Sequence, residues 1–169
     1  MTALNALLFE LMRASPRHAT PAVVAAQLLV VLAAPLTLAV AAVAWLRAGP
    51  RTRAELALAL GSALLAALPL LPAGSALDGD VLLLWALSLG LLPGRRLAWL
   101  AFPGLALGLA TGWAKVYLGL ALPLAVAAAL PVAVLASWLA WRLCLRLAPG
   151  RYHGLRRAMV RLSWRSRRR

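Results

Sequence analysis

Long apolar segments alternate with short polar ones along most of the chain. Residues 21–46 hold no charged side chain, and as a helix they would rise about 39 Å at 1.5 Å per residue, more than the ~30 Å hydrocarbon layer of a bilayer. Because a longer segment must tilt or bend, we expect a tilt or a kink at Pro35. The further apolar segments cover residues 54–71, 81–92, 97–113 and 118–147. The pattern therefore predicts five transmembrane helices, of which the third is short for a span.

A shorter segment precedes the first of these helices. Residues 2–13 place their leucines and Met12 on one helical face and polar residues on another, which is typical of a helix that lies in the membrane interface. The sequence Ser15-Pro16-Arg17-His18 is expected to end it. We therefore predict an all-α, polytopic membrane bundle of about five transmembrane helices and one N-terminal interfacial helix.

Composition supports a membrane protein. Apolar residues make up 64% of the 169 residues, well above the roughly 45–50% of soluble domains. The net charge of +14, from 18 basic and 4 acidic residues, suits anionic lipid headgroups. Nucleic acid is not expected as a partner, because the chain lacks stacking platforms on a soluble fold. The single cysteine, Cys144, excludes an internal disulfide and fits no metal-binding spacing, so we interpret it as a small apolar residue of a helix. We expect no cofactor.

The basic residues also predict an orientation. Short loops rich in arginine stay on the cytoplasmic side, and with five spans the segments 47–53 and 93–96 and the C-terminal tail all fall on one side. The loop 72–80, the only lysine, Lys115, and the N-terminal helix then lie outside. We expect a membrane domain over 1–148 and a basic cytoplasmic tail over 149–169 with eight arginines, which serves as a positive-inside anchor or as a site for anionic lipid or a partner.

Residues 112–125, Gly-Trp-Ala-Lys-Val-Tyr-Leu-Gly-Leu-Ala-Leu-Pro-Leu-Ala, join two apolar segments and carry this lysine. A cation between two membrane helices is costly unless it lies at the water interface or faces an anion. We therefore predict a bend here, with Lys115 at the outer interface and facing Asp78 or Asp80 of the preceding polar loop.

This segment resembles the third signature motif of the type 2 phosphatidic acid phosphatase superfamily, usually S-R-V-Y-L-G-V-H-Y-P-x-D. The form G-W-A-R-V-Y-L-G-V-H-F-P-L-D is typical of the bacterial undecaprenyl-diphosphate phosphatase branch. In this alignment Lys115 stands at the phosphate-binding arginine, with Tyr117 in frame. Ala121 stands at the nucleophilic histidine and Ala125 at the aspartate that orients it. The resemblance covers about residues 4–145 and implies that family's helical membrane fold, an inner-membrane location and a site on the outer face.

The other family motifs lack their chemistry. Residues 77–80 stand where the second motif, P-S-G-H or P-S-D-H, is expected, with Gly79 in register and Asp80 at the acid histidine. Asp78 and Asp80 are more simply interpreted as helix N-terminal acids. The first motif, K-x6-R-P, has no counterpart, because no basic residue occurs between Arg53 and Arg95. His18 and His153, the only histidines, match no family position.

These observations predict a protein that resembles lipid-phosphate phosphatases but is catalytically inactive, since a phosphohistidine mechanism needs a nucleophilic imidazole. Lys115 and Tyr117 would then remain from a phosphate-binding site, with polyprenyl phosphate or anionic phospholipid as the ligand. Two alternatives stay open: an active lipid-phosphate phosphatase with rearranged residues, and an accessory or scaffold subunit that binds another membrane protein. Asp78 and Asp80 form a weak ligand set, so no metal site is expected.

Overall fold

The computed structural model describes residues 6–7, 9–10, 20–70 and 77–147. The predicted interfacial helix over 2–13 lies largely outside the described residues, and the predicted tail over 149–169 lies wholly outside them.

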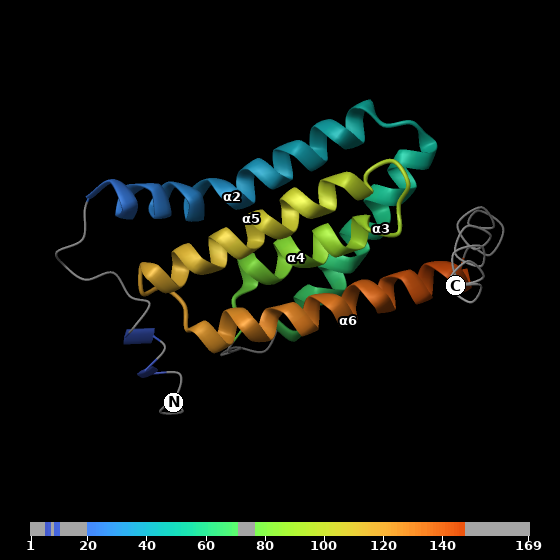
Figure 1. The fold of residues 1–169 in the computed structure, drawn as a ribbon. Coiled ribbons are helices and arrows are strands. Elements are labelled where there is room, and N and C mark those ends of the chain that lie inside the picture. The colour runs from blue at the N-terminus through green and yellow to red at the C-terminus, as the bar shows by residue number, and fades with distance from the viewer. Residues whose placement is uncertain (1–5, 8, 11–19, 71–76, 148–169) are drawn as a thin grey trace, which may run out of the picture.

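Five helices of 13 to 28 residues lie side by side in the described part of the chain, which contains no strand (Figure 1). They are α2 (Thr20–Arg47), α3 (Pro50–Ala67), α4 (Gly79–Leu91), α5 (Ala98–Tyr117) and α6 (Pro123–Leu147), and a 3-10 turn, η1 (Leu68–Leu70), follows α3. The prediction of an all-helical protein is confirmed. Each of the five apolar segments forms one helix.

Two boundaries differ from the prediction for local reasons. Helix α3 begins at Pro50, before the apolar segment starts, because the extended Gly49 leads into a proline at the first helical position, which needs no hydrogen-bonding N–H. The bend predicted within residues 112–125 is present, but it begins only after Tyr117, so α5 extends beyond the predicted end of its apolar segment at residue 113. Gly112 is buried inside α5, where a Cβ would come within 2.7 Å of Val126 Cγ1. Gly119, with φ of 77°, is the residue that turns the chain.

Helix α4 occupies the centre of the bundle and contacts α3, α5 and α6. Its side chains at Val81, Leu82 and Ala86 have no solvent exposure and pack with Trp85 against alanines of α3 and α6. Small residues let the backbones approach closely: Gly90 of α4 leaves no room for a Cβ, which would lie 2.6 Å from the Ala59 Cα. This central position explains how a helix of only 13 residues belongs to a membrane bundle.

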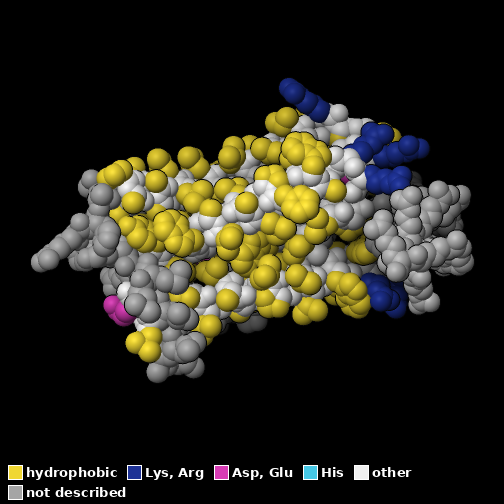
Figure 2. All heavy atoms as spheres, in the orientation of Figure 1, with side chains coloured by type: hydrophobic (Ala, Val, Ile, Leu, Met, Phe, Trp, Pro, Cys, Tyr) yellow, Lys and Arg dark blue, Asp and Glu magenta, His cyan; other side chains and the backbone are white. Residues whose placement is uncertain are grey.

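Among the residues that the structure describes, three helical segments are long and apolar enough to cross a membrane, namely Pro21–Arg47, Pro50–Leu70 and Pro123–Arg146. Helix α2 lies on the outside and chiefly against α5, and its apolar side chains are mostly exposed. Figure 2 shows apolar side chains covering the face of the bundle between its two ends. A surface of this kind requires a hydrocarbon environment, so the structure confirms the prediction of a membrane protein.

Candidate functional site

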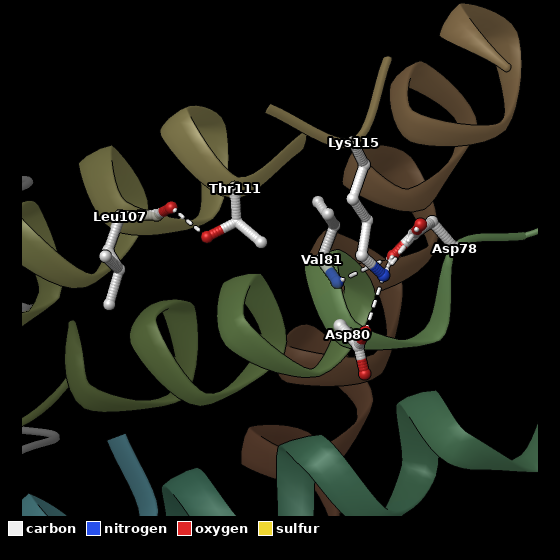
Figure 3. Close-up of polar contacts among 6 residues, drawn as sticks. All are labelled: Asp78, Asp80, Val81, Leu107, Thr111 and Lys115. Carbon is white, nitrogen blue, oxygen red and sulfur yellow. Dashed lines mark hydrogen bonds and ion pairs between the residues drawn. The ribbon is translucent and has the colours of Figure 1, made fainter. Parts of the chain in front are cut away.

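The lysine of α5 is paired with two carboxylates at one end of the bundle (Figure 3). Lys115 Nζ lies 3.0 Å from Asp78 Oδ1, 3.1 Å from Asp78 Oδ2 and 2.5 Å from Asp80 Oδ2. Only 12% of the lysine side chain and 8% of the Asp78 side chain are exposed, against 55% for Asp80. The prediction that Lys115 faces these two acids is confirmed.

The start of α4 places both acids. Asp78 is the N-cap residue, and its Oδ1 accepts a hydrogen bond of 3.1 Å from the backbone N–H of Val81. Asp80 lies in the first turn, where a negative charge is favoured by the exposed N–H groups of the helix. The interpretation of these residues as helix N-terminal acids is therefore confirmed. The same two carboxylates also hold the C-terminal end of α5.

Charge balance limits what this cluster can bind. One ammonium group faces two carboxylates, so the cluster carries a net charge of −1 when all three groups are ionised. A phosphate group would have to displace both carboxylates from Lys115 and would meet their repulsion. In this arrangement Lys115 joins α4 to α5 and presents no unpaired positive charge.

The other residues that the family resemblance singles out lie near the cluster without joining it. The backbone N–H of Ala121, in the α5 to α6 connection, donates to the Lys115 carbonyl at 3.3 Å. Ala125 lies in the first turn of α6. Tyr117 is about 200° around the helix from Lys115, and its ring stacks on Trp113 with centroids 5.1 Å apart. The structure thus brings Asp80 and Lys115 together and directs Tyr117 elsewhere.

A groove of about 670 Å³ lies between α4, α5 and α6, close to the Lys115 end. Its walls include Trp85, Trp113, Val116 and Val126. At Gly112 the wall is formed by backbone atoms, because this residue has no side chain. The Trp85 Nε1–H is already bound to the Leu105 carbonyl at 3.2 Å. With aliphatic and aromatic walls, the groove suits a hydrocarbon chain and offers no catalytic side chain.

Sequence reasoning missed the role of Glu55 on α3. Glu55 lies near the start of α3, where the helix dipole favours an acid, but its carboxylate crosses to the start of α5. Glu55 Oε1 accepts from Arg95 N at 2.9 Å, and Oε2 accepts from Leu97 N at 3.0 Å and from Arg96 N at 3.2 Å. This contact has no local sequence signal, since Glu55 and the N–H groups that follow the Pro93-Gly94 turn are 40 to 42 residues apart.

Two further classes of site have no support in the described structure. His18 and His153 lie outside the described residues. Across residues 6–7, 9–10, 20–70 and 77–147, no group of three or more histidine, cysteine, aspartate or glutamate residues is placed to hold a metal ion.

Comparisons of the chain with models of protein families, with curated proteins and with solved structures give no match.

Proposed function

We propose that this chain is a catalytically inactive relative of lipid-phosphate phosphatases, embedded in the inner membrane, that accommodates the hydrocarbon part of a lipid. The observation that carries the proposal is the meeting of Asp80 and Lys115 at one end of the bundle. These are the positions that the resemblance assigns to the acid histidine and to the phosphate-binding arginine. Here they form an ion pair, which supports a structural use of the former site.

The neighbouring groove supports a lipid as the ligand. It adjoins the ion-pair end through Val116, next to Lys115 in sequence, and through Pro123 at the start of α6. A chain of methylene or isoprene groups would bury apolar surface there, and each Å² buried would stabilise the bound lipid by roughly 25 cal/mol. The headgroup would then lie near the aqueous end of α5, where Lys115 is already neutralised, so we propose weak recognition of phosphate.

We further propose that all five helices cross the membrane. Helix α5 has 20 residues and would rise about 30 Å, which matches the hydrocarbon layer. Trp99 near its start and the stacked Trp113 and Tyr117 near its end suit the two interfaces, where amphipathic rings settle. Helix α4 is shorter, but its neighbours cover it. With five spans, the Lys115 end lies outside and the C-terminus lies in the cytoplasm.

Cysteine labelling tests this topology. In a Cys144→Ser background, a Ser75→Cys variant should react with an impermeant thiol reagent in intact cells, because residue 75 comes shortly before Asp78 in the sequence. The matched Arg96→Cys variant, at the opposite end, should react only after lysis. The reverse pattern, or equal labelling of both, would contradict the five-span arrangement.

Phosphate release tests the loss of catalysis. The purified protein should release no phosphate from undecaprenyl diphosphate above the level of a detergent blank, because Ala121 cannot form a phosphohistidine. Losing a nucleophile usually costs several orders of magnitude in rate. The Ala121→His, Ala125→Asp double variant should remain inactive too, since Lys115 stays paired with Asp78 and Asp80. Turnover by the unmodified chain that Lys115→Ala abolishes would instead establish an active phosphatase with rearranged residues.

A further inference from the structure

Seven exposed arginines gather at the end of the bundle opposite the Lys115 cluster, and we call them the arginine collar. Figure 2 shows basic side chains at this end of the visible face. They come from the end of α2 and the first turn of α3, from the α4 to α5 turn and from the last turns of α6, so they are spread over the ends of several helices. The members are Arg47, Arg51, Arg53, Arg95, Arg96, Arg142 and Arg146.

The collar keeps its positive charge within the described structure. Glu55 is the acidic residue that lies among these arginines, but its two oxygens accept from the backbone N–H groups of the α4 to α5 turn and the start of α5. The ion pairs found among the described residues both belong to Lys115, at the other end. Among the described residues, the guanidinium groups of the collar therefore have no carboxylate partner and are available to an external anion.

An exposed tryptophan accompanies each of the three segments. Trp45 is 38% exposed on α2, Trp99 is 66% exposed on α5 and Trp138 is 52% exposed on α6. Each lies within about one helical turn of a collar arginine, on the side toward the middle of the bundle. Amphipathic rings in this position settle at the level of lipid headgroups, so the collar lies where phospholipid phosphates lie.

Helix α6 supplies the best defined part of the collar. The guanidinium carbon of Arg142 lies 4.7 Å from the centre of the Trp138 ring, which fixes the planar group beside the ring. Arg146 follows one turn later on the same helical face and is also exposed. Two guanidinium groups, one of them held in place, can bind the oxygens of one phosphodiester with paired hydrogen bonds.

We infer that the arginine collar binds the headgroups of anionic phospholipids, with Arg142, Arg146 and Trp138 forming a specific site. The collar is spread over the ends of several helices and adjoins exposed apolar side chains such as Leu46 and Leu143, which suits lipid headgroups better than an acidic protein. A ring of headgroups fits that arrangement. The inference rests on the membrane location alone and does not depend on the proposed loss of catalysis.

Native mass spectrometry of the full-length protein in a mild neutral detergent tests the inference. Titration with phosphatidylglycerol should give more lipid adducts than titration with phosphatidylcholine, and added salt should reduce the difference. Arg142→Gln with Arg146→Gln should weaken phosphatidylglycerol binding on the order of tenfold. The matched control, Arg167→Gln with Arg168→Gln, removes the same charge from the tail and should leave most of the binding intact.

Three results would overturn the inference: equal binding of the two lipids, equal losses in the two double variants, or binding of a soluble poly-glutamate peptide in place of phosphatidylglycerol. The last would establish an acidic protein segment as the partner. Because Arg142 and Arg146 are exposed, the thermal unfolding midpoints of both double variants without added lipid should match that of the wild type. A lower midpoint for the collar variant would require repeating the titration with Trp138→Leu, which should also weaken binding severalfold if the site is correct.

Discussion

Glu55→Ala should lower the free energy of unfolding by about 2–3 kcal/mol, because the start of α5 would lose a charged hydrogen-bond acceptor. Three successive backbone N–H groups, those of Arg95, Arg96 and Leu97, donate to this one carboxylate. The first N–H groups of a helix have no partner within the helix, and they attract negative charge. Water can reach the Arg95 and Arg96 groups, which keeps the expected loss below that of a fully buried site.

Unfolding in mixed micelles, followed by denaturant or by temperature, measures this effect. Glu55→Gln should lie between the wild type and Glu55→Ala, because an amide retains one oxygen acceptor but no charge. Glu10→Ala removes the same charge from an exposed side chain and should change stability by no more than about 0.5 kcal/mol. Similar losses for Glu55→Ala and Glu10→Ala would contradict the role assigned to Glu55.

The helices themselves were predictable from hydropathy. Each apolar segment became a helix because backbone groups in an apolar environment must be satisfied within the segment. The ends were less predictable, since they depend on single residues. Pro50 extended α3 toward the N-terminus. The bend predicted within residues 112–125 is present, but α5 continues past Gly112, which packs closely against α6, and the chain turns only after Tyr117.

The ion pair was predictable and the arrangement of α4 was not. A lone lysine among apolar residues must find an anion, and the loop before α4 offered two. The short apolar segment at 81–92 was instead interpreted as a weak span. Residues 81–92 hold no charged side chain on any face, as a central helix requires. Only the packing of Val81, Leu82 and Ala86 against three neighbouring helices identifies it as the centre.

Glu55 marks the limit of local rules. An acid near the start of a helix is usually assigned to that helix, and a sequence gives no measure of distance to residues 40 positions away. The absence of a side chain at Gly94 leaves room for the Glu55 carboxylate, because a Cβ there would lie 2.6 Å from Glu55 Oε2. The sequence shows a glycine after a proline in this turn, but it does not show that the Glu55 carboxylate occupies the space beside that glycine.

The largest loss of stability is expected at Asp78, with Asp80 as its internal comparison. Asp78→Ala should cost about 2–4 kcal/mol, because it removes both the N-cap of α4 and the better buried partner of Lys115. Asp80→Ala should cost no more than about 1 kcal/mol, since its carboxylate is 55% exposed and water screens the pair. Unfolding in mixed micelles measures both losses. Because Asp78→Ala also removes the N-cap, equal losses would mean that Asp80 is the principal ion-pair partner of Lys115.

A double-mutant cycle separates the cap from the ion pair. Asp78→Asn keeps an oxygen that can accept from the Val81 N–H but removes the negative charge that faces Lys115. Lys115→Met keeps the apolar length of the side chain and leaves two carboxylates side by side. Because each change removes the same contact, the double variant should be more stable than the sum of the two losses predicts, by about 1–2 kcal/mol. Strict additivity would show that Lys115 and Asp78 do not stabilise each other, and the α4 to α5 contact would then rest on apolar packing alone.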